Sequence, residues 1–192
     1  MKKSKNILNY SQPNFYKFSR DSIELADLAV KYEKENLSLQ VLELFAGSGV
    51  IGVEFENKHQ SVEHITFIEL QEEFEPYLKE NTKNLNCDFK IFFQDFRSLD
   101  TKKKYDVILL NPPYFDSKKS RIGSDDNRNL CRFILNFELK DIFKQLESCL
   151  SKSGSAYICH CDNLEELDTR VSRVGEYQGV GLFRFRLNVN RA

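Results

Sequence analysis

Short apolar runs alternate with amphipathic segments along most of the chain. Apolar runs bounded by turn signals are typical of buried strands, and apolar positions at helical spacing predict helices. The predicted strands cover residues 41–45, 64–69, 89–93, 105–110 and 156–159, with a final strand or hairpin over 182–187. The predicted helices cover residues 22–32, 50–58, 72–84 and 136–150. Such alternation predicts an α/β fold with a mostly parallel, doubly wound sheet. The first helix is expected to take Asp21 or Ser22 as its N-cap.

A glycine turn follows the first predicted strand, at the edge where doubly wound sheets bind their ligands. Gly47 and Gly49 permit positive φ and close backbone approach, and the helix N-terminus after them favours a negative group such as a carboxylate. Glu69 ends the second strand, at the distance where a nucleoside-binding unit carries an acid for ribose hydroxyls. Asp95, after the third strand, could accept a hydrogen bond from an adenine amino group. These positions predict a nucleoside cofactor.

A dinucleotide site is the rival interpretation of this turn. Gly47-Ser48-Gly49-Val50-Ile51-Gly52 matches the Gly-x-Gly-x-x-Gly string, which is weak evidence alone. An acid at Glu43 is awkward beside a pyrophosphate but suits a cationic amino acid group. Glu43 therefore favours S-adenosylmethionine over a nicotinamide cofactor. A tight turn without any ligand is the other alternative.

The sequence Asn111-Pro112-Pro113-Tyr114 directly follows the apolar run 106–110. Two prolines end the strand and give a rigid tip with an amide side chain, prolyl carbonyls and one aromatic plane. A planar amide or amino group needs such acceptors for its N–H bonds and such a face for its ring. Together with the predicted cofactor residues at the glycine turn and at Glu69 and Asp95, this tip predicts an S-adenosylmethionine-dependent N-methyltransferase.

Composition sets limits on the rest of the molecule. The 192 residues fit one domain, 1–192, and the net charge of −1 excludes a polycation. Basic residues concentrate in a leader over 1–20, in 117–132 and in 170–191, which could form a phosphate-binding face or be scattered solvated charge. No apolar run suits a membrane helix and the N-terminus lacks a secretory signal, so a cytosolic, membrane-free monomer is the default.

The chain has five cysteines, an odd number, and they lack the regular spacing of disulfide-rich proteins, which argues against a disulfide scaffold. Cys159-His160-Cys161 invites a metal interpretation, but a tetrahedral site needs a second pair of ligands that the sequence does not offer. We therefore expect buried strand cysteines and no metal.

The motifs together resemble a known family. Glu43, Gly47-x-Gly49, Glu69, Asp95 and Asn111–Tyr114, in that order, resemble the Rossmann-like class I methyltransferases. Four segments are similar to the bacterial tRNA adenine-N6 methyltransferases that modify the adenine 3′ to the anticodon of valine tRNA. They are Gln12-Pro13 with Tyr16–Ser22, Leu44–Gly52, Ile68–Glu73, and Asn111–Phe115 with its basic loop. The match covers residues 10 to 160, whereas 161–192 look shorter than and different from that family's C-terminal region.

The resemblance implies a seven-stranded sheet with helices on both faces and a set of site residues. Asn111 Oδ1 and the Pro112 carbonyl would accept the two N–H bonds of the target amino group, and Tyr114 would stack on the base. The implied catalytic residues are Asn111, Pro112, Pro113 and Tyr114. The implied cofactor-binding residues are Phe18, Glu43, Phe45, Gly47, Gly49, Glu69, Leu70, Asp95, Phe96 and Asn111. The implied substrate-binding residues are Tyr114, Phe115, Lys118, Lys119, Arg121 and Arg128, within a substrate loop over 116–132 that is expected to be mobile around 123–126. Phe18 and Phe115 could instead be core residues.

The implied partner is RNA, most simply a tRNA anticodon loop, since the target base must be flipped or unpaired. Several alternatives stay open. Protein glutamine N5-methyltransferases acting on release factors use the same Asn-Pro-Pro-Tyr tip. A guanine-N2 rRNA enzyme, a DNA adenine enzyme and a non-catalytic RNA-binding module are the others.

Overall fold

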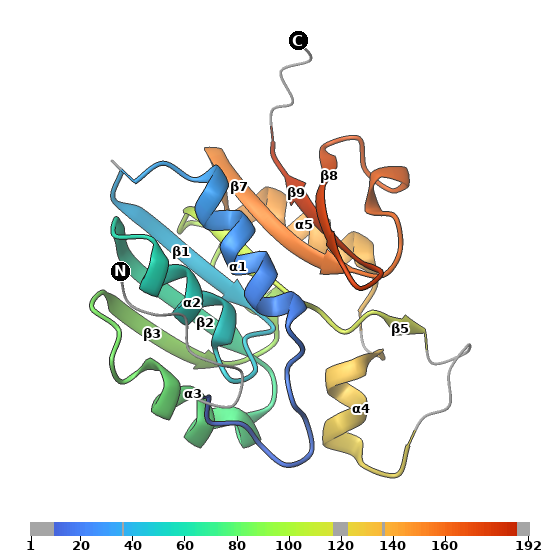
Figure 1. The fold of residues 1–192 in the computed structure, drawn as a ribbon. Helices are drawn as coiled ribbons and strands as arrows, with labels where there is room; N and C mark the ends of the chain where they lie inside the picture. Colours follow the sequence, from blue (N-terminus) through green and yellow to red (C-terminus); the bar gives the residue numbers. More distant parts are fainter. Residues whose placement is uncertain (1–9, 36, 117–122, 136, 188–192) are drawn as a thin grey trace.

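The computed structural model describes residues 10–35, 37–116, 123–135 and 137–187. Its main sheet has seven strands in the order β3-β2-β1-β4-β7-β9-β8 (Figure 1). Neighbouring strands are parallel except at β9, which runs antiparallel to both β7 and β8. The strands are β1 (Leu39–Leu44), β2 (Val62–Glu69), β3 (Asp88–Phe93), β4 (Tyr105–Leu110), β7 (Leu150–His160), β8 (Val171–Tyr177) and β9 (Val180–Phe185). The predicted mostly parallel seven-stranded sheet is confirmed.

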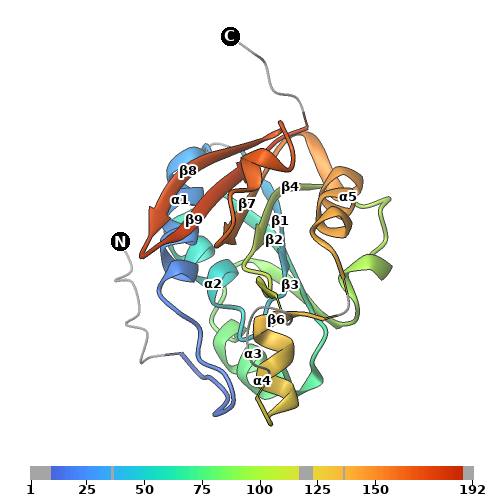
Figure 2. The same cartoon turned by 90° about the vertical axis from the view of Figure 1, so that its right-hand side faces the viewer.

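Helices cover both faces of the sheet, as predicted. Figure 2, which views the sheet nearly edge-on, shows α1 (Asp21–Tyr32) and α2 (Val50–Lys58) on one side and α5 (Leu139–Cys149) on the other. Helix α3 (Glu75–Thr82) packs on the α1–α2 side, because Leu78 belongs to the same buried cluster as Phe55 of α2. The short 3-10 helices are η2 (Glu72–Phe74), η3 (Phe96–Ser98) and η4 (Leu164–Glu166).

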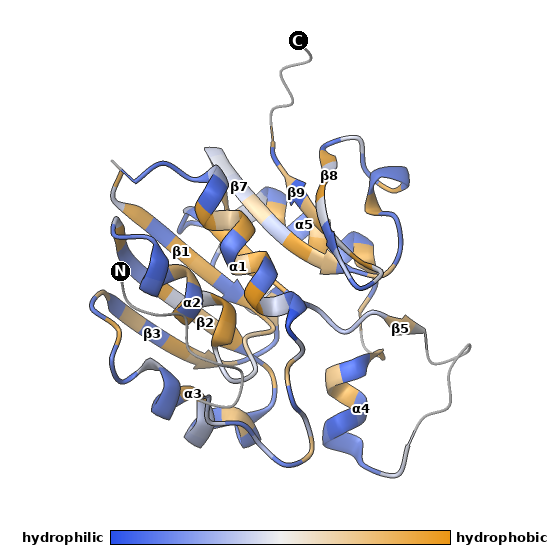
Figure 3. Cartoon of the chain, in the orientation of Figure 1, coloured by the Kyte–Doolittle hydropathy of each residue, from blue (hydrophilic) through white to orange (hydrophobic). Residues whose placement is uncertain are grey.

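The core lies in two layers, one on each face of the sheet. Successive residues of β4 contribute to opposite layers, so that Ile108 packs towards α5 and Leu109 towards α1 and α2. A parallel strand buried on both faces is apolar at every position rather than at alternate ones, which explains the unbroken run 107–110. Figure 3 shows this pattern as mostly hydrophobic central strands between helices with hydrophilic outer faces.

The strand order reverses between β1 and β4, which lie side by side in the middle of the sheet. Leu44, the last residue of β1, is paired with Leu110, the last residue of β4. The glycine turn after β1 and the Asn111 tip after β4 therefore start from adjacent points. This is the topological switch point at which doubly wound sheets bind ligands.

Several predicted boundaries are wrong by a few residues. The strand predicted over 41–45 ends at Leu44. The helix predicted over 72–84 is η2 followed by α3 and ends at Thr82. The helix predicted over 136–150 begins at Leu139, because Glu138 and Asp141 form a capping box there. Neither Asp21 nor Ser22 is the N-cap of α1, since Arg20 holds that position and Asp21 is the first helical residue.

The segment predicted as a mobile substrate loop contains regular structure where it is described. Helix α4 (Asp126–Arg132) begins after Asp125, whose Oδ1 accepts a hydrogen bond from the Arg128 N–H at 3.0 Å. Strands β5 (Phe115–Asp116) and β6 (Phe133–Ile134) pair in parallel as a separate two-stranded sheet. Figure 1 places α4 and β5 beyond the carboxyl ends of the main sheet. The segment predicted as a loop thus contains a capped helix start at Asp125 and Asp126, and the expected mobility around residues 123–126 stays a prediction.

The final strand or hairpin predicted near the C-terminus is the β8–β9 hairpin. Its two-residue turn, Gln178-Gly179, has φ of 48° and 84°, which suits the type I′ turns of tight hairpins. Three arginines of this region are engaged within the protein. Arg170 pairs with Asp168 and Glu147, and Arg173 pairs with Glu176. Arg184 donates to Ser155 Oγ at 3.0 and 3.1 Å. These contacts engage three of the five arginines that suggested a phosphate-binding face, whereas Arg186 is exposed and Arg191 lies outside the described residues.

No helix in the described ranges has the length and apolar character needed to cross a membrane.

Asn81 ties the N-terminal leader to the glycine turn. Its Nδ2 donates to the Ser11 and Ser48 carbonyls, both at 2.9 Å, and its Oδ1 accepts from the Ser11 N–H at 2.9 Å. Asn81 is buried on α3, so three segments far apart in the sequence meet at one amide. Of the basic leader residues, Lys2, Lys3 and Lys5 lie outside the described ranges.

Replacing Asn81 with alanine should therefore lower the free energy of unfolding by about 3 kcal/mol, because three buried hydrogen bonds are lost together. Urea denaturation measures this loss. Asn84→Ala is the matched control, since Asn84 is exposed just after the same helix. Equal losses in the two variants would show that the Asn81 contacts do not stabilise the fold.

Candidate active site

The glycine turn takes a backbone path that needs left-handed residues. Phe45, Gly47 and Gly49 have φ of 56°, 51° and 74°. A Cβ on Gly49 would lie 2.4 Å from Leu78 Cδ1, so only glycine fits between the turn and α3. Phe45 adopts positive φ despite its side chain, at a cost of about 1–3 kcal/mol, and such strain clusters at functional sites.

Glu69, at the end of β2, holds the glycine turn through hydrogen bonds to backbone N–H groups. Its Oε2 accepts from the Gly47 N–H at 2.7 Å, and its Oε1 accepts from the N–H groups of Leu70 and Gln71, both at 2.9 Å. Burial raises the pKa of the Glu69 carboxyl, and the three backbone N–H groups act in the opposite direction. A buried carboxylate therefore lies at the place where the sequence predicted a ribose-binding acid.

Glu43 lies deeper, on β1, beneath the start of α2. Its Oε2 accepts from the Gly52 N–H at 2.7 Å, so the carboxylate takes up an N–H group at the N-terminus of α2. A Cβ on Gly52 would lie only 2.6 Å from this oxygen. Burial raises the pKa of Glu43 to about 8, while its bonds to Gly52 and Ile51 act in the opposite direction. The oxygens of two acids thus already accept backbone N–H groups at this turn, so these N–H groups are not available to a pyrophosphate.

The raised pKa of Glu43 makes stability depend on pH. The folded protein holds this proton up to about pH 8, whereas the carboxyl has an ordinary value of 4.5. The contribution of Glu43 to stability is therefore fully present below pH 4.5 and is lost as the pH rises to about 8. The loss should approach about 1.4 kcal/mol per pH unit. Urea denaturation between pH 5 and pH 9 measures it.

Glu43→Gln is the variant that isolates this effect, because the amide keeps an oxygen for the Gly52 N–H and does not titrate. The difference in unfolding free energy between the wild type and Glu43→Gln should change steadily over this pH range in favour of the variant. A constant difference would contradict the raised pKa.

Asn111 is held in one orientation by α1. Its Nδ2 donates to Ser22 Oγ at 3.0 Å, and Ser22 is buried. With Nδ2 engaged, the acceptor Oδ1 is left for another group, and no donor among the described residues bonds to it. Pro112 is buried directly after it. The tip therefore presents a fixed amide oxygen at the switch point.

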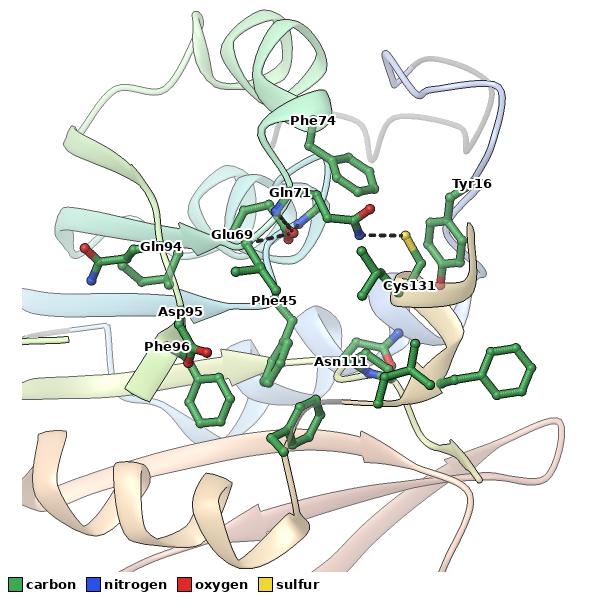
Figure 4. Close-up of a pocket in the computed structure, with 18 of the residues that line it drawn as sticks. Tyr16, Phe45, Glu69, Gln71, Phe74, Gln94, Asp95, Phe96, Asn111 and Cys131 are labelled. Atoms are coloured by element: carbon green, nitrogen blue, oxygen red, sulfur yellow. Dashed lines mark hydrogen bonds between the residues drawn. The ribbon is translucent and has the colours of Figure 1, made fainter. Parts of the chain in front are cut away.

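Two adjoining pockets meet at this tip. The larger runs from Glu69 and Asp95 to the tip, and the smaller runs beneath the turn to Glu43. Figure 4 shows the larger pocket, with Phe45, Glu69 and Asp95 on one side and Asn111 and Tyr16 on the other. The residues that line both pockets are Tyr16, Phe45, Gly47, Phe74 and Asn111. A molecule that filled both pockets would pass directly beside Asn111.

The structure places most of the predicted cofactor residues around these pockets. Phe45, Gly47, Glu69, Leu70, Asp95, Phe96 and Asn111 line the larger pocket. Phe18 and Glu43 line the smaller one, and Phe18 also packs edge-on against Tyr10 with ring centroids 5.6 Å apart. Gly49 lines neither pocket and shapes the turn instead.

Asp95 remains an ionised acceptor in the larger pocket. Its carboxylate binds the Arg97 guanidinium, with 2.9 Å from Nε to Oδ1 and 2.5 Å from Nη2 to Oδ2. The hydrogen bond from Arg97 holds the pKa of Asp95 below its ordinary value. Arg97 also lines the pocket, which the sequence analysis did not anticipate.

Several further pocket residues were missed. Tyr16 comes from the leader, and burial raises the pKa of its hydroxyl, which keeps it protonated. Gln71 donates to Cys131 Sγ at 3.2 Å and so joins η2 to α4 over the pocket. Phe137 packs on Phe45 and Phe96, with ring centroids 5.3 and 5.5 Å away. For Tyr16, the one signal in the sequence was the similarity of Tyr16–Ser22 to the family. The contacts of α4 and Phe137 join segments far apart in the sequence, and no sequence pattern indicated them.

The predicted substrate residues that the structure describes, Tyr114, Phe115 and Arg128, line neither of the two pockets. Tyr114 packs edge-on against His160, with ring centroids 5.6 Å apart, and touches Phe115 at 5.0 Å. Neither Tyr114 nor Phe115 lines a pocket, although Pro113 does. Arg128 is exposed on α4. Lys118, Lys119 and Arg121 lie outside the described residues.

The cysteine motif at the end of β7 is only partly as expected. Cys159 is fully buried, but Cys161 lies beyond the strand and is exposed, so the expectation that both are buried is wrong for Cys161. Polar atoms of His160, Cys161 and Asp162 lie within 4.8 Å of one another. His160 Nδ1 accepts from the Asp162 N–H at 3.0 Å, and His160 is fully buried.

Comparison with known proteins identifies the family. The family model described as "methyltransferase small domain" matches residues 16–126. A tRNA1(Val) (adenine(37)-N6)-methyltransferase of Glaesserella parasuis serovar 5 is 28% identical over 140 residues, which are 71% of this chain and 58% of that protein. The chain spans about half the length of the curated relatives it matches, with 53% and 49% for the next two.

Solved structures share the fold at low identity. A ribosomal protein L11 methylase from Lactobacillus delbrueckii subsp. bulgaricus has a TM-score of 0.59 at 17% identity, over 88% of this chain and 80% of that one. A coclaurine N-methyltransferase bound to N-methylheliamine and SAH has a TM-score of 0.52 at 17% identity, over 80% of this chain and 43% of that one. The matching family model spans the glycine turn, Glu69, Asp95 and the Asn111 tip, and on this ground the chain belongs to the methyltransferase small domain family.

Proposed function

We propose that this protein transfers a methyl group from S-adenosylmethionine to the N6 amino group of adenine in RNA, most simply in a tRNA. One observation carries the proposal: Asn111, oriented by Ser22, lies where the two pockets join. An amide acceptor at that junction can bind an amino group beside the cofactor. The proposal takes residues 1–192 as one domain.

The polar and apolar residues that line both pockets fit this cofactor. Glu43 and Glu69 lie under the turn, and Phe45, Phe74 and Phe96 supply apolar walls. A phosphate-free nucleoside suits this turn, because Glu43 and Glu69 already occupy N–H groups that a dinucleotide would need for its pyrophosphate. Glu69 would hold the ribose, Asp95 the adenine amino group, and Glu43 would lie nearest the amino acid part.

When bound, S-adenosylmethionine supplies an electrophilic methyl group. The chain then has to position the acceptor nitrogen. Asn111 Oδ1 and the Pro112 carbonyl would accept its two N–H bonds, which fixes the direction of its lone pair. Holding two reactants in line can lower a barrier by several kcal/mol, so positioning supplies a large part of the catalysis. Pro112 and Pro113 keep the tip rigid, so little entropy is lost on binding.

RNA is favoured as the substrate by the names of the sequence relatives, which are tRNA adenine-N6 methyltransferases. Tyr114 and Phe115 offer aromatic faces beside the tip for an unpaired base. The test is to incubate the purified protein with labelled S-adenosylmethionine and, separately, with total tRNA, rRNA, DNA and a release factor. Digestion and mass spectrometry then identify the product.

N6-methyladenosine in tRNA is the expected product. Label in the release factor alone would replace the proposal with glutamine N5-methylation, because the same tip can bind a side-chain amide. Label in rRNA as N2-methylguanosine would keep the chemistry and change the base. A protein that binds the cofactor without transferring label to any substrate would contradict the proposal.

A further inference from the structure

An aromatic and cationic platform lies next to the Asn111 tip, formed by the side chains of Phe115 and Arg132. The pairing of β5 with β6 sets Phe115 opposite Phe133. Arg132, the last residue of α4, then places its guanidinium carbon 5.1 Å from the centroid of the Phe115 ring and 5.7 Å from that of Phe133. We call the Phe115 and Arg132 side chains the platform.

The platform is open to solvent and its charge is not neutralised. Phe115 is 36% exposed although it lies in a strand pairing. No carboxylate in the described ranges forms an ion pair with Arg132. Arg170 and Arg173 provide the contrast, because both also lie over phenylalanine rings and both bind carboxylates.

The platform lies within reach of a group bound at the tip. The Phe115 ring is 5.0 Å from the Tyr114 ring, centroid to centroid, and Tyr114 follows the two prolines of the tip. Burial raises the pKa of Tyr114 to about 12, and the nearby charge of Arg132 acts in the opposite direction. Arg132 also acts on the pKa of Tyr16, in the pocket wall, again against the larger effect of burial. The charge of Arg132 therefore acts on both tyrosines.

We propose that the platform is a second nucleotide subsite, on which the base next to the target adenine stacks while Arg132 binds the phosphate that joins the two nucleotides. Aromatic rings and guanidinium planes are the surfaces on which unpaired bases stack in RNA-binding proteins. The guanidinium presents five N–H donors at its rim, so it can stack and still reach a phosphate. This inference rests on the proposed function, since the first subsite is the one for the target adenine.

The subsite sets a minimum size for the substrate. A dinucleotide that contains adenine reaches both subsites, whereas free adenosine reaches only one. Stacking on an aromatic side chain is worth about 1–3 kcal/mol, so loss of the second subsite should weaken binding by about 10-fold or more. The lost phosphate contact should also lower the slope of log K against log salt by about 0.7.

The test uses a short single-stranded RNA with one adenine and a fluorescent 2-aminopurine on its 5′ or its 3′ side, bound in the presence of S-adenosylhomocysteine. Because the protein has no tryptophan, it adds little fluorescence of its own. Binding to the wild type should change the emission of one of the two probes through stacking. Phe115→Leu should remove that change, and Arg132→Gln should flatten the salt dependence.

Two matched controls separate the platform from general surface effects. Phe89→Leu changes another exposed phenylalanine, on β3, and Arg173→Gln changes another arginine over a ring, on β8. Both should leave emission and affinity unchanged. Wild-type-like emission and affinity in Phe115→Leu and Arg132→Gln would overturn the inference.

The fluorescence result does not depend on turnover. A protein that methylates adenine in RNA but stacks neither probe would retain the proposed function and lose the second subsite. A protein that stacks a probe on Phe115 but methylates a different base would retain the subsite and lose the adenine assignment.

Discussion

Asn111→Ala should lower the rate of methyl transfer by about 10²- to 10³-fold, as is typical when one fixed polar contact to the reacting group is removed. The amide oxygen beside both pockets would be lost, and nothing else on the tip could accept the same N–H bond with fixed geometry. The affinity for S-adenosylhomocysteine should stay near that of the wild type, because Glu69 and Asp95 remain. Single-turnover rates and calorimetry measure the two quantities.

Ser22→Ala is a second variant, for which a smaller loss of rate is expected than for Asn111→Ala. It keeps the amide and removes only the acceptor of the Asn111 Nδ2 bond. Loss of one such bond is worth about 0.5–1.5 kcal/mol, so the rate should fall by about 2- to 10-fold. A wild-type rate in Asn111→Ala would remove the proposed role of that side chain, whatever the result for Ser22→Ala.

Glu69→Ala should weaken cofactor binding by about 100-fold. The change removes the acceptor proposed for the ribose and also leaves three N–H groups, those of Gly47, Leu70 and Gln71, without their carboxylate. Hydrogen bonds to a charged group are worth about 1.5–3 kcal/mol each, and the turn would lose the shape of its binding wall. Calorimetric titration with S-adenosylhomocysteine measures the affinity.

Glu69→Gln keeps the size of the side chain and removes its negative charge. The amide retains one acceptor oxygen but turns an NH2 group towards one of the backbone donors. An intermediate affinity is expected. Glu72→Ala is the control, because Glu72 is an exposed acid only three positions away. If Glu69→Ala bound the cofactor as tightly as Glu72→Ala, the ribose contact would have to come from another residue.

The sequence predicts the sheet well because burial on two faces leaves an unmistakable pattern. The strand 105–110 and the helix 50–58 are found with the predicted bounds. Glu69 and Asn111 could be found for a related reason: each directly follows or ends an apolar run, and the ends of parallel strands meet at one edge. Their pairing partners, such as Ser22 for Asn111, depend on how α1 packs and were not predicted.

The missed features have a common physical origin in tertiary contact. Helix α4 is seven residues long, too short for a periodic apolar pattern, and it is held by Asp125 and by the Gln71–Cys131 bond. Phe45 takes a positive φ that local propensity would never assign to phenylalanine. The arginines near the C-terminus resembled a basic face in the sequence, but Arg170 pairs with Glu147 of α5, which the sequence pattern did not predict.

The two acids beneath the glycine turn carry a consequence for selectivity in a cell. In nucleotide-binding proteins, the amides at the first helix end are left open to attract phosphate oxygens. Here Glu43 and Glu69 already occupy amides of that kind with the protein's own oxygens. ATP and NADH would find these N–H groups already occupied and would compete weakly with the proposed S-adenosylmethionine.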